Sequence, residues 1–213
     1  MSEREPSAVA VRGPIAAEDQ ARSNFYALLG RLYAGAPDAA LLAAIAEGGE
    51  LSIETSDDTA RSLAAAWRTL TAASAAMDPE AAAQEYVDLF VGVGRSEVSL
   101  HAAEYLRSTG GSVLAELRAE LARLGLSRQA GVSLFEDHLA AVLETMRVLV
   151  AGASGIEPRA PAEQGAFFAR YVSSWVPRCC DAIIAVPVAN YYRRVAEFTV
   201  FFVAIERDSF AIE

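Results

Sequence analysis

Apolar side chains recur along most of this chain at intervals of three and four residues, and this spacing restricts the fold more than any other feature. One example is the set Phe25, Leu28, Leu29, Leu32 and Tyr33. In an α-helix such positions share one face, whereas a half-buried strand would alternate apolar and polar residues. Alternating runs are scarce here and alanine, the strongest helix former, is abundant. The pattern predicts an all-α chain.

Glycine and proline separate these apolar stripes and indicate where helices begin and end. Asp78 followed by Pro79 is typical of a helix start, because aspartate accepts hydrogen bonds from free amides and proline suits the first turn. Ser133 and Glu136 have the spacing of a capping box, which predicts a helix that begins there and runs to about Val150. We expect a single-domain helical bundle of about nine helices over residues 17–213, after a flexible N-terminal arm at residues 1–16.

Composition and charge disfavour several functions. The formal net charge of −10 argues against nucleic acid and anionic lipid as partners. All 18 basic residues are arginines, so neither Schiff-base chemistry nor the phosphate-binding lysine of a P-loop is open to this chain. The apolar run from Phe198 to Ile205 is much shorter than the roughly 20 residues of a membrane span. Since the first residues also lack an export-signal pattern, we expect a cytoplasmic protein without stable membrane insertion.

Histidine and cysteine offer little for catalysis or metal binding. His101 and His138 are the only histidines, and neither belongs to a His-x-x-x-His or Glu-x-x-His ligand pair. Cys179 and Cys180 are adjacent, which suits neither a Cys-x-x-Cys motif nor an ordinary disulfide, so we expect buried thiols. No Gly-x-Ser-x-Gly elbow is present. The sequence therefore predicts a protein that is not an enzyme and that has no metal or other cofactor.

The stretch from Glu85 to Leu106 interrupts the helical pattern and is the best candidate for a binding surface. Gly92 and Gly94 flank a single valine, and neither a helical nor a strand period continues beyond them. Irregular connections between rigid helices often carry binding residues. Glu85 and Asp88 share one face of the preceding helix, although a solvated helix face would also explain those two carboxylates.

This stretch resembles chaperones of the TorD/DmsD/NarJ type, which mature molybdenum oxidoreductases. Those proteins carry a tyrosine followed by Leu-Phe, a glycine-containing loop, and a Ser-Pro-x-Glu-Ser-x-Tyr-like run. The matching residues here are Tyr86, Leu89, Phe90, Gly92, Ser99 and Tyr105. Leu100, Ala102 and Ala103 stand where that run has its proline, glutamate and serine.

A second motif of the same family, Glu-Asp-His-Leu followed by Leu-Glu-x-Met, is similar to a later part of the chain. The matching residues are Glu136, Asp137, His138, Leu139, Leu143, Glu144 and Met146. Phe167, Trp175 and Pro177 match a third run, and the helix that follows Asn190 looks like the family's closing helix. The resemblance extends from about residue 22 onward.

The resemblance implies a maturation chaperone that binds the apo catalytic subunit of a molybdopterin oxidoreductase, often with its twin-arginine leader, until the cofactor is inserted. Such a leader is a basic pair followed by an apolar segment, so its receptor needs carboxylates beside an exposed apolar groove. We expect the leader to contact Asp137, His138, Glu136, Glu104, Tyr105, Ser99, Glu85, Asp88, Leu100 and Phe135. The chaperone would be a monomer or a dimer.

Two alternatives concern the site and the function. Asp137 and His138 could have a purely structural role at a helix start, whereas as binding residues they should lie beside the stretch from Gly92 to Tyr105. The chain could also be a helical domain that binds a small ligand in a closed apolar pocket, or a hydrolase-like bundle with a metal or nucleotide at His138. An open groove would favour the chaperone over the ligand-binding domain, whereas a metal or nucleotide bound at His138 would favour the hydrolase-like bundle.

Overall fold

The structure is a computed structural model that describes residues 15–51, 57–92, 94–108, 111–129, 131 and 133–212. Nine α-helices and no β-strand occur in these residues, so the predicted all-α class is confirmed. The helices are α1 (Ala17–Ala34), α2 (Ala39–Ala46), α3 (Asp58–Ala76), α4 (Pro79–Tyr86), α5 (Val113–Arg123), α6 (Leu139–Ala151), α7 (Pro161–Phe168), α8 (Val176–Ala185) and α9 (Tyr191–Phe210). Shorter turns are the π-helices η1 (Val87–Val91) and η3 (Ala169–Ser173) and the 3₁₀-helix η2 (Ala102–Glu104). Of the predicted arm, residues 1–14 lie outside the described part of the chain.

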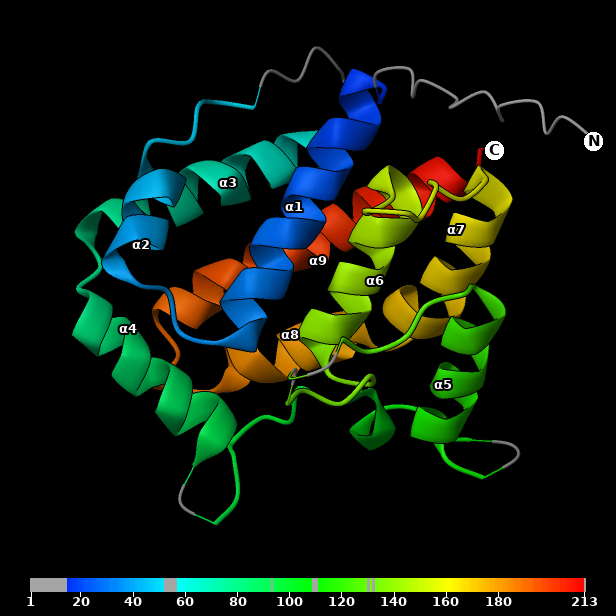
Figure 1. The fold of residues 1–213 in the computed structure, drawn as a ribbon. Helices are drawn as coiled ribbons and strands as arrows, with labels where there is room; N and C mark the ends of the chain where they lie inside the picture. The colour runs from blue at the N-terminus through cyan, green and yellow to red at the C-terminus, as the bar shows by residue number, and fades with distance from the viewer. Residues whose placement is uncertain are drawn as a thin grey trace, which may run out of the picture.

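Helices α1 and α6 pack side by side at the centre of the molecule, and α9 passes behind them in the view of Figure 1. Helices α3 and α8 pack against α9, and α2 packs against α3. The apolar stripe predicted on α1 faces inward, since Leu29, Leu32 and Tyr33 are fully buried. Buried residues of α1, α3, α6, α8 and α9 form one continuous apolar core. The single domain stays a prediction, which this core supports.

Aspartate starts two of the helices, and the start predicted at Asp78 is confirmed. Asp57 accepts hydrogen bonds from the first turn of α3, and the Asp78 carboxylate accepts the N–H groups of Glu80 and Ala81 at 3.0 Å at the start of α4. Helix α4 continues into η1 and ends at Gly92, where φ is +65° and a Cβ would collide with the carbonyl of Arg95. The predicted departure from the helix after Phe90 is therefore confirmed.

The predicted capping box at Ser133 and Glu136 is wrong. Helix α6 begins at Leu139, later than the sequence suggested, and His138 is its N-cap residue. The Glu136 carboxylate does not turn back to the chain at Ser133, because Arg118 of α5 donates a hydrogen bond to it at 3.0 Å. A contact between distant parts of the sequence thus outweighs the local pattern.

Within the described residues, no helix is both long enough and apolar enough to cross a membrane.

Candidate functional site

Two connecting segments meet beside the N-terminus of α6. His101 and His138 pair as an isolated antiparallel β-bridge. The N–H of Ala102 donates to the carbonyl of Asp137 at 2.9 Å, and the N–H of Leu139 donates to the carbonyl of Leu100 at 2.8 Å. The prediction that Asp137 and His138 lie beside the stretch from Gly92 to Tyr105 is therefore confirmed. We call this pairing of residues 100–102 with residues 137–139 the bridge.

An ion pair joins the two segments of the bridge. The Asp137 carboxylate is only 4% exposed and lies 3.1 Å from Nδ1 of the partly exposed His101. Burial opposes ionisation of Asp137, but the hydrogen bond and charge of His101 outweigh burial, so the pKa of Asp137 lies below its ordinary value. The same hydrogen bond raises the pKa of His101. The pair favours a charged imidazole on the surface and a charged carboxylate beneath it.

His138 has a different task from His101. Its buried Nδ1 accepts the N–H of Ala140 at 3.2 Å and so caps α6. Burial, together with the nearby charge of His101, lowers the pKa of His138 to about 4. A neutral ring keeps the lone pair that the cap requires. The ring of His101 meets it edge to face, with the two centroids 5.1 Å apart.

Residues next to the bridge make further contacts. Glu136 lies 3.0 Å from Arg118 and 4.0 Å from Arg128, and the hydrogen bond from Arg118 is the main reason that its pKa is lowered. Phe135 is 51% exposed and presents an apolar ring to solvent. Leu100 is buried in the core, so it supports the bridge from within.

The other segment of the bridge borders a polar hollow of about 620 Å³. Its lining includes Ser99, Glu104, Tyr105, Arg95 and Glu97. The Tyr105 hydroxyl donates to the carbonyl of Ser99 at 3.0 Å, and its ring stacks on Trp175 at 5.5 Å. Glu104 is exposed, and its negative charge contributes to the raised pKa of the nearby His101.

Glu85 and Asp88 do not join the bridge. The Glu85 carboxylate accepts three backbone N–H groups at the start of α9, from Asn190, Tyr191 and Tyr192. Asp88 is exposed and accepts a hydrogen bond from Gln84 at 2.7 Å. Of the ten residues predicted to contact a leader, these two are placed elsewhere.

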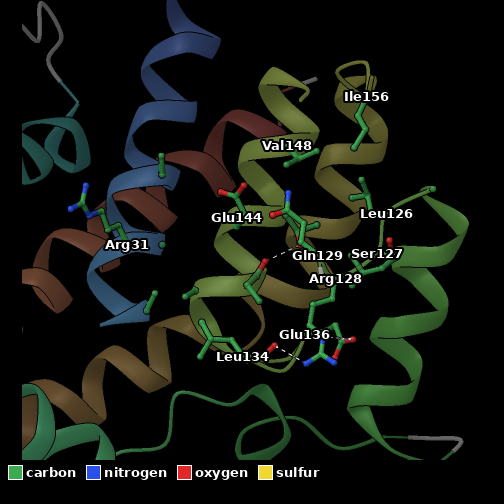
Figure 2. A pocket seen from close by; sticks show the side chains of 18 residues that line it. Arg31, Leu126, Ser127, Arg128, Gln129, Leu134, Glu136, Glu144, Val148 and Ile156 are labelled. Atoms are coloured by element: carbon green, nitrogen blue, oxygen red, sulfur yellow. Dashed lines mark hydrogen bonds and ion pairs between the residues drawn. The ribbon is translucent and has the colours of Figure 1, made fainter. Parts of the chain in front are cut away.

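A larger hollow, which we call the groove, lies between α1, α6 and the connection that follows α5. Figure 2 shows it from close by, with side chains from all three segments around it. Its volume is about 640 Å³, and it opens to solvent. Small and aliphatic residues form most of its surface, and four charged residues are Arg31, Arg128, Glu136 and Glu144. Glu136 is the only one of the ten predicted contact residues in this lining.

The sequence analysis missed most of the groove, although one signal was available. Ala27, Gly30 and Ala34 follow one another at intervals of three and four on α1, so they share one face. Such small side chains allow α6 to come close, and Ala140 and Ala141 face them from that helix. A stripe of small residues is less visible than an apolar stripe, because alanine is common throughout this chain.

Potential metal ligands and nucleophiles are sparse in the described part of the chain. Within it, no group of three or more His, Cys, Asp or Glu side chains could hold a metal ion. Cys179 and Cys180 are free and buried, as predicted, and burial raises the pKa of Cys179 to about 12. A thiol with so high a pKa is a poor nucleophile at neutral pH.

Comparison with known families gives a match that covers more than half of the chain. A family model described as the nitrate reductase delta subunit matches residues 56–181. This span contains both segments of the bridge and helices α3 to α7. A comparison with curated proteins gave no match.

Proposed function

Because the chain belongs to the nitrate reductase delta subunit family, one of the redox-enzyme maturation chaperone families, we propose that it binds the apo catalytic subunit of a molybdopterin oxidoreductase until the cofactor is inserted. The resemblance to TorD/DmsD/NarJ-type chaperones is thereby confirmed. The family's role is chaperoning rather than catalysis, so the proposed activity is binding without turnover. We place this activity in the cytoplasm, where the apo subunit would await its cofactor.

The groove is the observation that carries this proposal. An apolar client segment would bury its side chains against the small residues of α1 and α6, which is the usual way that a helix or extended chain docks in a groove. The groove opens to solvent, unlike the closed pocket expected of a small-ligand sensor. Phe135 is exposed next to Leu134 and Glu136, which line the groove, and its ring would add apolar surface at this edge.

The carboxylates predicted to bind an arginine pair of the leader differ in whether a group of the protein itself already forms a hydrogen bond with them. Asp137 is held by His101, Glu136 by Arg118, and Glu85 by the first turn of α9. A leader arginine would have to displace those partners, which weakens its net gain. Glu104 lies exposed on the rim of the polar hollow, and its charge acts on His101 without a hydrogen bond between the two side chains. In our proposal Glu104 therefore receives an arginine of the leader, while the groove receives the apolar segment.

Calorimetry can test this proposal. The N-terminal peptide of each molybdopterin oxidoreductase catalytic subunit in the source organism would be titrated, one at a time, against the protein. At least one peptide should bind the wild-type protein. Ala141→Phe places a ring in the groove and should weaken that binding at least tenfold, a change of about 1.4 kcal/mol. Ala65→Phe, on the exposed face of α3, is the matched control and should bind like wild type.

A further variant separates the two parts of the site. Glu104→Gln should weaken a peptide with an Arg-Arg pair and leave its Ala-Ala version unchanged, because only the first loses a charge-assisted hydrogen bond. Circular dichroism would show that each variant is folded. Binding of the peptide to Ala141→Phe with wild-type affinity would exclude the groove, and a wild-type protein that binds none of the peptides would contradict the proposed function.

A further inference from the structure

Helix α9 receives its N-terminal cap from a distant residue. Its N-cap residue, Asn190, makes no capping hydrogen bond with its own side chain. The Glu85 carboxylate instead accepts the N–H groups of Asn190 and Tyr192 at 2.8 Å and of Tyr191 at 3.0 Å. Free amides at a helix start need acceptors, and a negative charge there is favoured by the helix dipole. One side chain of α4 thus meets the needs of the first turn of α9.

Hydrogen bonds continue from this cap toward the bridge. Glu85 lies in the last turn of α4, which passes directly into η1. In η1 the carbonyl of Leu89 accepts the N–H of Val98 at 3.0 Å. Two residues later the carbonyl of Leu100 accepts the N–H of Leu139, the first residue of α6. An unbroken sequence of backbone and side-chain contacts therefore joins the start of α9 to the start of α6.

Aromatic rings strengthen the first part of this connection. The ring of Tyr192 lies 5.7 Å from Tyr86 and 5.0 Å from Phe90, and the two latter rings lie 5.2 Å apart. The Tyr86 hydroxyl also donates to the carbonyl of Tyr33 on α1. Packing keeps α4 and η1 close to α9, while the Glu85 carboxylate fixes their position along it, because hydrogen bonds are directional and apolar contacts are not.

We propose that Glu85 is a positioning residue of the client site, which by capping α9 fixes residues 98–102 and, through them, the start of α6 and the wall of the groove. The inference rests on the proposed function and gives Glu85 a role other than contact with a leader. Ala140 and Ala141, the first groove residues of α6, follow directly on the residue that the bridge holds. A small displacement of the bridge would therefore also move Ala140 and Ala141 and change the shape of the groove.

Hydrogen exchange followed by mass spectrometry, combined with peptide calorimetry, tests this role. Glu85→Ala should speed exchange about tenfold or more at Asn190–Tyr192, because these amides lose charge-assisted hydrogen bonds. Exchange at residues 98–102 should rise by a similar factor, because the cap holds this segment in place through α4 and η1. The peptide that binds wild type should bind this variant several-fold more weakly. Glu85→Gln keeps an acceptor oxygen and should restore part of both properties.

Two controls separate positioning from general destabilisation. Asp88→Ala removes an exposed carboxylate from the same segment and should behave like wild type. Glu206→Gln alters a buried carboxylate near the other end of α9, and should lower stability without changing exchange at residues 98–102. If Glu85→Ala changes exchange at Asn190–Tyr192 alone, Glu85 is a local cap and the proposal is overturned. The exchange result does not depend on peptide binding, so it judges the coupling even if no peptide binds wild type.

Discussion

At the start of α6, His138 takes a place that serine, threonine, aspartate or asparagine usually occupies. An imidazole can do so only while it is neutral, because a protonated ring has no lone pair to offer. Burial keeps the His138 ring neutral, whereas the hydrogen bond to Asp137 raises the pKa of His101 and favours the proton there. The pKa values of the two histidines of the bridge are therefore shifted in opposite directions, so His101 takes up a proton at a higher pH than His138.

The depressed pKa of His138 predicts an acid-sensitive fold. The unfolded chain takes up a proton at His138 near its ordinary pKa of 6.5, whereas the folded chain resists until about pH 4. The free energy of unfolding should therefore fall as pH decreases through that interval, by at most about 3 kcal/mol. Urea denaturation of wild type and His138→Asn between pH 7 and 4 would measure it, since asparagine can still cap but does not titrate.

Between pH 6.5 and 4 the change in stability reports on His138, because its neighbours His101 and Asp137 lose their contributions outside this interval. The raised pKa of His101 gives stability that is present below 6.5 and is lost only as pH rises through its folded pKa. The lowered pKa of Asp137 gives stability that is lost only as pH falls below its ordinary value of 3.8. Parallel stability curves for wild type and His138→Asn would show that His138 does not titrate as described.

For single residues, the sequence predicted where a side chain lies better than what that side chain does. The motif that contains Asp137 and His138 was correctly placed beside residues 92–105, because the resemblance put both in the region that holds the leader in such chaperones. The capping box failed because Arg118, far away in the sequence, takes the carboxylate of Glu136. The role of Glu85 could not be read from sequence either, since its partners lie more than 100 residues later. Hydrogen bonds between distant residues leave no local pattern.

At the scale of helices, the close packing of α1 on α6 determines both the core and the groove. Gly30 lies at this packing contact, and a Cβ there would be 3.5 Å from the carbonyl oxygen of Ala140 and 3.9 Å from Cβ of Leu143. These are ordinary van der Waals distances. Glycine is therefore not required at this position by space, and it weakens the helix by its freedom in the unfolded chain.

Gly30→Ala should raise the stability of the protein. The expected gain is about 0.5–1 kcal/mol, from the higher helix propensity of alanine, or a few degrees in melting temperature. Gly165→Ala in α7 is the matched comparison, because its Cβ would lie 3.3 Å from the Phe210 ring and part of the gain would be lost. Thermal unfolding by circular dichroism measures both. A lower melting temperature for Gly30→Ala would mean that α1 and α6 pack more tightly than these distances indicate.

Most helices could be predicted from the sequence because each buries a face with the period of a helix. The apolar stripe of α1 and the start of α4 agree with the structure. The π-helical turns η1 and η3 could not be foreseen, since the apolar spacing of Leu89 and Phe90 suits an α-helix equally well. The groove was also missed, because it depends on which helix lies next to α1.

At the scale of the whole molecule, the first and last helices are joined by a buried ionic cluster. Glu206 of α9 is only 1% exposed, and Arg22 of α1 donates to it at 2.7 Å from Nε and 3.0 Å from Nη2. The Tyr26 hydroxyl adds a third hydrogen bond at 2.7 Å. The cluster connects residues that are 184 positions apart, so only the folded chain reveals it. It fixes the position of α1, whose other face lines the groove.

Removal of one partner from this cluster should cost far more than removal of an exposed ion pair. Arg22→Met leaves the Glu206 carboxylate buried without its counter-charge, and we expect a loss of about 3 kcal/mol in the free energy of unfolding, at the lower end of the range for buried pairs because Arg22 is partly exposed. Arg194→Met breaks the more exposed pair with Glu197 and should cost no more than about 1 kcal/mol. Urea denaturation at pH 7 compares the two variants.

The double variant Arg22→Met/Glu206→Gln completes the cycle and tests the cause of that loss. If the cost of Arg22→Met comes from an unpaired buried charge, the second substitution removes that charge and recovers part of the stability. The sum of the losses in unfolding free energy of Arg22→Met and Glu206→Gln should then exceed the loss of the double variant by more than about 0.5 kcal/mol, the usual limit for independent sites. Additive effects would instead mean that Arg22 acts through its other contacts, the ion pair with Asp19 at 2.9 Å and the Phe210 ring 5.0 Å away, and not through Glu206.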